Sequence, residues 1–145
     1  MAVGPGAAVT IDQLQAPPRI DLDGEGLFCL MAVCLAGSEQ QELCWCVSNV
    51  PDYEFGLGLQ VASYMPPSAL PPYRLVFLLY RQPGDDPMDL QVAGADAVPR
   101  KLNEAAAPTD SLPQQGGRAA FDAKQCAADN CLGHPVAVSW VEVQA

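Results

Sequence analysis

Three apolar segments between residues 27 and 81 constrain the fold of this chain more than any other feature. Leu27–Leu35 is almost continuously apolar and lies between glycines, which is typical of a central strand covered on both faces. Leu43–Val50 and Tyr73–Arg81 are also rich in apolar and β-forming residues, and Trp45 is the largest apolar residue of the former. Fourteen prolines and twelve glycines imply many turns and few long helices. The sequence therefore predicts a mainly β architecture.

Shorter segments are expected to add to these strands. Val9–Ile11 and Ile20–Asp23 are expected to form short strands, and Gly56–Ala62 an edge strand. Residues 82–115 contain five prolines and are expected to be loop-like, with at most a short strand near Leu90–Val92 and a poor helix near Leu102–Ala107. A loop of this length in a compact domain indicates function or contact with a partner.

The C-terminal part of the chain predicts one helix and the last strand. Asp122 and Gln125 have the spacing of a capping box, which predicts a helix that begins there and stops by Gly133. Pro135–Val143 then alternates between apolar and other residues, as a half-buried strand does. We expect one or two short helices in the whole domain.

Charge and composition exclude several classes of function. Half of the residues are hydrophobic and 17% are charged, which indicates a globular chain. The net charge of −10 disfavours binding to nucleic acids or to anionic lipid surfaces, because both need clustered basic residues. No segment reaches the roughly 18–20 apolar residues of a membrane span, so we expect a chain that does not span a membrane. The N-terminal residues lack a signal-peptide pattern, and secretion is not expected.

Six cysteines and one histidine are the residues with the most reactive side chains. No cysteine pair has the C-x-x-C spacing of many zinc sites, so we expect buried reduced thiols and no metal or other cofactor. Cys44 and Cys46 are two residues apart, which predicts that they share one face of a strand. His134 is expected to be exposed in a turn. Because no base is evident near Cys44 and no serine has a nucleophile context, we expect no catalytic residue.

Three blocks, in this order along the chain, resemble the phosphatidylethanolamine-binding protein (PEBP) family. They are LCWCVSNVP at Leu43–Pro51, YMPPSALPPYRLVFLLYRQ at Tyr64–Gln82 and GRAAFDAKQCAADNCLGHPVAVSW at Gly117–Trp140. The resemblance implies a PEBP-like β-sandwich, in which a large central antiparallel sheet is joined by a smaller sheet and a few helices. It implies that residues 27–145 form the PEBP-like domain, and that residues 1–26 form an N-terminal arm with the first short strands.

The resemblance also places the ligand pocket of the family. Cys34 and Ala36 stand where two aspartates of the family would be, and Cys44 and Tyr73 stand where two histidines would be. In the family these acids and histidines surround a cavity that binds phosphate or a phospholipid headgroup. Their replacement removes the titratable hydrogen-bond donors together with the acids that orient them. We therefore expect these four ligand-binding positions to be non-functional.

Two functions agree with these observations. The first is a non-catalytic scaffold or interaction subunit of a larger protein assembly, similar to the PEBP-like domain of a mitochondrial large-ribosomal-subunit protein. The partners would then be protein subunits, and the location the mitochondrion or otherwise the cytoplasm. The alternative is a soluble regulator that binds a small anionic ligand or a signalling protein, similar to the kinase-inhibiting and flowering-control members of the family. An enzyme built around Cys44 is a third, less favoured interpretation.

Overall fold

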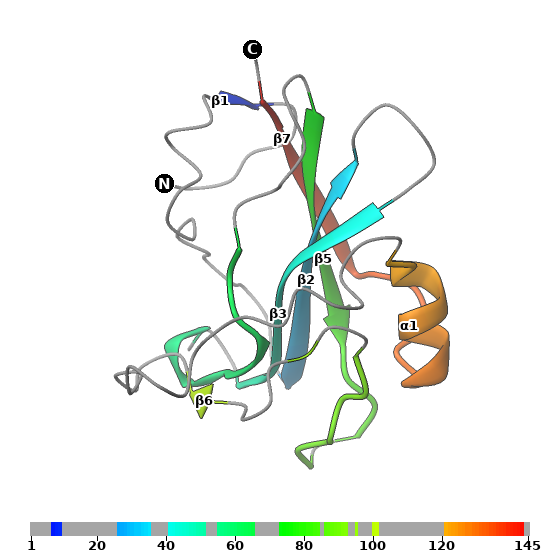
Figure 1. Cartoon of the computed structure of the whole chain (residues 1–145). Coiled ribbons are helices and arrows are strands. Elements are labelled where there is room, and N and C mark those ends of the chain that lie inside the picture. Colours follow the sequence, from blue (N-terminus) through cyan, green and yellow to red (C-terminus); the bar gives the residue numbers. More distant parts are fainter. Residues whose placement is uncertain are drawn as a thin grey trace.

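The computed structural model describes residues 7–9, 26–35, 41–51, 55–65, 73–84, 86–92, 95, 100–101 and 121–143. These residues form a β-sheet with one α-helix beside it, which confirms the predicted mainly β architecture (Figure 1). The strands are β1 (Ala7–Val9), β2 (Leu27–Leu35), β3 (Gln41–Pro51), β4 (Leu59–Ala62), β5 (Tyr73–Arg81), β6 (Arg100–Lys101) and β7 (Ala137–Val143). The helices are the 3-10 turn η2 (Phe55–Leu57) and α1 (Ala123–Asp129).

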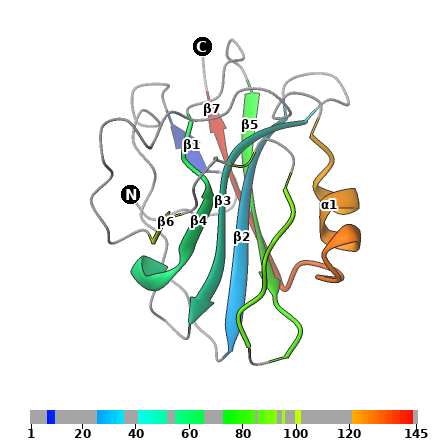
Figure 2. The same cartoon turned by 60° about the horizontal axis from the view of Figure 1, so that its bottom comes forward.

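The strand order β1-β7-β5-β2-β3-β4-β6 places β2 in the middle of the sheet (Figure 2). Neighbouring strands are antiparallel, except that β1 runs parallel to β7. The predicted central strand at Leu27–Leu35 is thus confirmed. The strand expected at Gly56–Ala62 forms as β4, over Leu59–Ala62. The expectation that it lies at the edge of the sheet is wrong, because β4 lies between β3 and β6. All described strands belong to this one sheet, and the smaller sheet expected from the family resemblance is not among them.

Apolar residues are buried on both faces of the sheet. On one face, here called the Trp45 face, Leu30 and Ala32 of β2 pack in a cluster with Trp45. On the other, here called the helix face, Met31 and Val33 pack in a cluster that includes α1. Successive residues of a strand point to opposite faces, so a strand covered on both sides must be apolar at almost every position. This explains the nearly continuous apolar sequence of β2.

Two irregularities in β3 change which side chains point to each face. Ala32 pairs with Trp45 but Val33 pairs with Leu43, so β3 contains an extra residue, Cys44, at this point. A bulge of this kind places two consecutive residues on one face. Cys44 and Trp45 therefore both lie on the Trp45 face, whereas Cys46 lies on the helix face. The prediction that Cys44 and Cys46 share a face is wrong because the alternation of the strand is interrupted between them.

The helix begins as its capping residues predict. The side chain of Asp122 accepts a hydrogen bond from the backbone N–H of Gln125 at 3.0 Å. The side chain of Gln125 donates to Asp129 instead of returning to Asp122, so half of the expected capping box forms. The helix ends at Asp129, which confirms the prediction that it stops by Gly133. After the turn that follows, β7 begins at Ala137, in agreement with the predicted last strand.

The expected strand at Leu90–Val92 is not formed. The backbone N–H and carbonyl of Gln91 bind the side-chain amide of Asn130, at 2.8 and 2.9 Å, in place of a neighbouring strand. In the N-terminal part, β1 ends at Val9, so the predicted short strand lies two residues too late in the sequence. The strand expected at Ile20–Asp23 and the helix expected at Leu102–Ala107 lie outside the described residues.

A network of side-chain amides joins β3 to the end of β5 and to the loop after it. Asn49 has a positive φ of 54° within the second irregularity of β3. Its backbone N–H donates to Oε1 of the buried Gln82, and Nε2 of Gln82 donates to Asn49 Oδ1, each at 2.7 Å. Asn49 also binds the backbone carbonyl and N–H of Met88, each at 2.9 Å. The network satisfies polar groups that would otherwise be buried without partners.

Candidate functional site

Three of the four predicted pocket positions lie together on the Trp45 face. Cys34 is near the end of β2, Cys44 near the start of β3 and Tyr73 at the start of β5. Antiparallel pairing brings these ends of three neighbouring interior strands together. All three are buried in the same cluster. The fourth position, Ala36, lies outside the described residues. We refer to Cys34, Cys44 and Tyr73, with Tyr64 packed against them, as the Tyr73 cluster.

The surroundings of Cys34, Tyr64 and Tyr73 favour the neutral forms of these three side chains. The pKa of Tyr73 is raised to about 12, mainly by burial and to a smaller extent by the charges of Cys34, Cys44 and Glu42. Burial, followed by the charge of Glu42, also raises the pKa of Cys34 to about 12. The pKa of Tyr64 is raised as well, mainly by burial. A neutral thiol is a poor nucleophile, so the raised pKa of Cys34 makes this side chain unsuited to covalent catalysis.

One polar atom in this cluster has no partner. The Tyr73 hydroxyl is buried and makes no hydrogen bond with any described residue, whereas the thiol of Cys44 donates to the backbone carbonyl of Glu42 at 3.7 Å. Arg74, which follows Tyr73, is directed elsewhere: its guanidinium binds Glu142 at 2.8 Å and lies 5.6 Å from the ring centre of Trp140. The groups that influence Tyr73 are therefore thiols and a carboxylate, which do not attract an anion.

Trp45 supports this cluster from the side. Its ring makes edge-on contacts with Phe55 and Tyr64, at centroid distances of 5.5 and 5.6 Å. Its indole N–H donates to Gln60 Oε1 of β4 at 2.8 Å. The indole N–H of Trp45 is thus hydrogen-bonded and its ring is packed against two aromatic rings, so we assign Trp45 a structural role.

Alkaline pH is expected to destabilise the fold through this cluster. The ordinary pKa values are 9.0 for a thiol and 10.0 for a tyrosine, but Cys34 and Tyr73 reach about 12 in the folded chain. Below pH 9.0 these groups are mostly protonated in the folded and in the unfolded chain, so they do not lower the free energy of unfolding there. The free energy of unfolding should fall as the pH rises towards 12, because the unfolded chain releases these protons first. Urea midpoints measured across this range would test the expectation, and complete tyrosinate absorbance in the still folded protein would contradict it.

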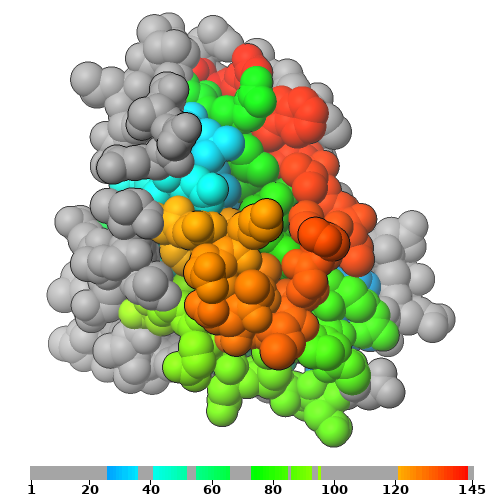
Figure 3. Space-filling model, turned by 90° about the vertical axis from the view of Figure 1, so that its right-hand side faces the viewer, coloured from blue at the N-terminus to red at the C-terminus, as the bar shows by residue number. Residues whose placement is uncertain are grey.

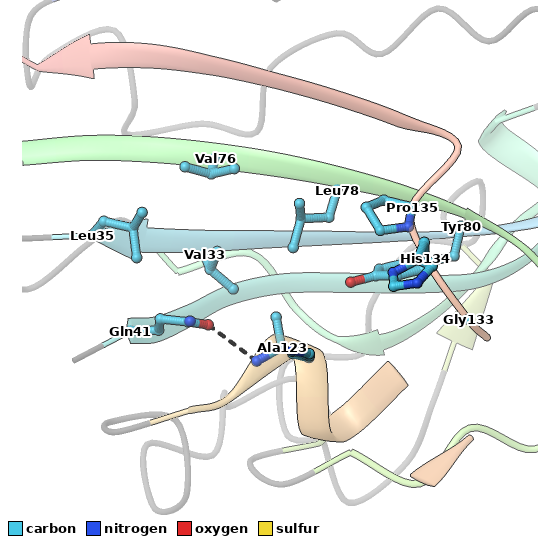
Figure 4. Close-up of a pocket in the computed structure, with 11 residues that line it drawn as sticks. Val33, Leu35, Gln41, Val76, Leu78, Tyr80, Ala123, Gly133, His134 and Pro135 are labelled. Carbon is cyan, nitrogen blue, oxygen red and sulfur yellow. Dashed lines mark hydrogen bonds between the residues drawn. The ribbon is translucent and has the colours of Figure 1, made fainter. Parts of the chain in front are cut away.

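A groove on the helix face is a second candidate site, which the sequence did not reveal. It has a volume of about 370 Å³ and lies between α1, the residues before β7, and the sheet (Figure 3). Four apolar side chains form its floor, Val33 and Leu35 from β2 and Val76 and Leu78 from β5 (Figure 4). Its walls are the first turn of α1 and residues 133–135. Pockets of this size lined by apolar side chains are typical of sites for small ligands.

The groove exists because the helix is shorter than the strands beneath it. A strand of nine residues is about 30 Å long, whereas a helix of seven residues is about 10 Å long. Two hydrogen bonds to Gln41 fix where the helix begins. The backbone N–H of Phe121 donates to the Gln41 carbonyl at 2.8 Å, and that of Ala123 donates to Gln41 Oε1 at 3.0 Å, the second of which Figure 4 shows. The part of the floor beyond these contacts is left open. Alternation along each strand places Val33 with Leu35 and Val76 with Leu78, but the pairing of the two strands and the short helix over them come from the structure.

The histidine and cysteines of the sequence occupy different environments. His134 is exposed, as predicted, and lines the groove. Five cysteines are buried, as predicted, but Cys131 is exposed in the turn after α1. Within the described ranges, no group of three or more His, Cys, Asp or Glu side chains is placed to hold a metal ion. No helix in those ranges is long and apolar enough to cross a membrane.

No protein-family model and no curated protein matches this chain.

Proposed function

We propose that this chain is a non-catalytic, PEBP-like interaction subunit of a larger protein assembly. One surface carries the proposal: the segment Val136–Trp140, here called the valine edge. Val136 is 59% exposed and Val138 is 46% exposed. Of the described strands, β1 alone lies beside the outer side of β7, and it pairs with Val141–Val143, beyond the valine edge.

An edge of this kind normally needs protection. Proteins protect exposed strand edges with charged residues, prolines or bulges, because an open edge pairs with other chains. The segment from Val136 to Trp140 contains no charged residue and no proline. Coverage by another protein would remove both the unpaired edge and the exposed valines from water. The net charge of −10 favours a partner with a basic surface around the contact.

The Tyr73 cluster supports the non-catalytic part of the proposal. The pKa values of Cys34 and Tyr73 are raised, and the carboxylate of Glu42 lies near both side chains. The described residues that influence Tyr73 include no cation. These properties favour a lost anion site over a regulator that binds a small anionic ligand, which remains the alternative. The PEBP-like sandwich and the mitochondrial location remain part of the proposal and depend on the sequence resemblance.

The proposal predicts stable association that depends on the valine edge. Purified from its source cell under native conditions, the chain should elute with a fixed set of proteins, far above its own 15.3 kDa. The double substitution Val136→Lys and Val138→Lys should abolish most of this association, because two buried charges without partners each cost several kcal/mol. Size-exclusion chromatography followed by mass spectrometry would measure it.

The control adds the same charge elsewhere. Ala128→Lys with Gln91→Lys places two lysines at exposed positions outside β7, and this variant should retain the partners. Circular dichroism would confirm that both variants fold. Elution of the wild-type chain as a monomer, or retention of the same partners by the valine-edge variant, would contradict the proposal.

A further inference from the structure

The groove beside α1 differs from its surroundings in charge. The chain has 17 acidic residues against 7 lysines and arginines, yet no carboxylate is among the described residues that line the groove, and its two basic side chains are Lys124 and His134. Both are exposed, and no described carboxylate pairs with either of them. The acids at the two ends of α1 are engaged elsewhere, because Asp122 caps the helix and Asp129 accepts from Gln125. The walls therefore offer uncompensated hydrogen-bond donors, one of them cationic.

The floor of the groove suits an aliphatic chain. Val33, Leu35, Val76 and Leu78 present a continuous apolar surface, because Val33 and Val76 are direct partners across β2 and β5. Water on this surface would be displaced favourably by an apolar group. In Figure 4 the four side chains extend along the two strands, with His134 and Pro135 at one end and Ala123 opposite the floor. A ligand with an apolar chain and a negatively charged end would match both parts.

We propose that the groove binds an apolar monocarboxylate, a small molecule with an aliphatic chain and one carboxylate. The chain lies over the floor formed by β2 and β5. The carboxylate accepts a charge-assisted hydrogen bond from Lys124 and a second hydrogen bond from His134. This site is separate from the Tyr73 cluster, which lies on the opposite face of the sheet. It also goes beyond the proposed association through the valine edge and does not depend on it.

The test compares a charged and an uncharged ligand that have eight carbon atoms each and different head groups. Isothermal titration calorimetry of the purified full chain with sodium octanoate should show binding. The alcohol 1-octanol, with the same number of carbon atoms and no charge, should bind at least about tenfold more weakly, which corresponds to about 1.4 kcal/mol. Higher ionic strength should weaken the binding of octanoate and leave that of 1-octanol unchanged.

Two variants identify the residues. Lys124→Met removes the charge but keeps an unbranched side chain, and it should weaken octanoate binding roughly five- to tenfold while 1-octanol is unaffected. Arg81→Met removes a cation that does not line the groove and should leave both affinities unchanged. Equal affinities for octanoate and 1-octanol, unchanged binding of octanoate to Lys124→Met, or no binding of octanoate to the wild-type chain would each overturn the proposal.

Discussion

Replacing Trp45 with alanine is expected to lower the free energy of unfolding by about 3–5 kcal/mol. Trp45 is 2% exposed and packs at the centre of the Trp45 face. The substitution removes the edge-on contacts with Phe55 and Tyr64 and leaves Gln60 without its indole partner. Because domains of this kind are stable by about 5–15 kcal/mol, the variant should retain little of its folded population at elevated temperature.

Urea denaturation followed by circular dichroism would measure this change. Trp140→Ala is the matched control, since it removes the same side chain from a half-buried position at the side of the sheet. It should cost clearly less, because part of the Trp140 ring is already in contact with water. An equal loss of stability in the two variants would show that Trp45 does not have the central packing role assigned to it.

Replacing Gln82 with leucine is expected to cost about 2–4 kcal/mol. The side chain of Gln82 is buried, and both of its polar atoms bind Asn49. Leucine has a comparable volume but cannot bind, so the backbone N–H of Asn49 would lose its acceptor inside the protein. Leaving a buried polar group without a partner costs more than a hydrogen bond gains.

We expect Gln82→Leu to increase local opening around the amide network as well as to lower the free energy of unfolding of the whole domain. Hydrogen exchange should accelerate at the amides of Asn49 and Met88, because both depend on the same network. Gln91→Leu, an exposed position in the following loop, is the control and should change the urea midpoint little. Equal stability of the two variants would contradict a structural role for the amide network.

The predictability of each part of this fold depends on how local its cause is. β2 and β5 could be predicted from their apolar sequences, because the order of apolar residues in a strand indicates which of its faces are buried. The bulge at Cys44 is invisible in sequence, since LCWCV is apolar whichever residue is the extra one. Leu90–Val92 has the composition of a strand, but the side chain of Asn130 takes its backbone hydrogen bonds.

The two candidate sites also differ in how far they could be predicted from the sequence. Cys34, Cys44 and Tyr73 were identified as pocket positions from the family resemblance, and the antiparallel strand ends place these three together. Tyr64, which packs in the same cluster, was not among the predicted positions. The groove depends on where a short helix stops over longer strands, and on Gln41, which fixes that helix from a distant part of the chain. Long-range contacts of this kind have no signature in a local pattern.

The strand order also determines when the sheet can be completed during synthesis. β5 pairs with β2, which has already been made, and with β7, which is the last described strand. A nascent chain that has reached the end of β5 can therefore form the β2–β5 and β2–β3 ladders but leaves the other side of β5 unpaired. Until β7 leaves the ribosome, that apolar strand is exposed to pairing with other chains. The cell must keep this intermediate from aggregating for as long as the intervening residues take to be translated.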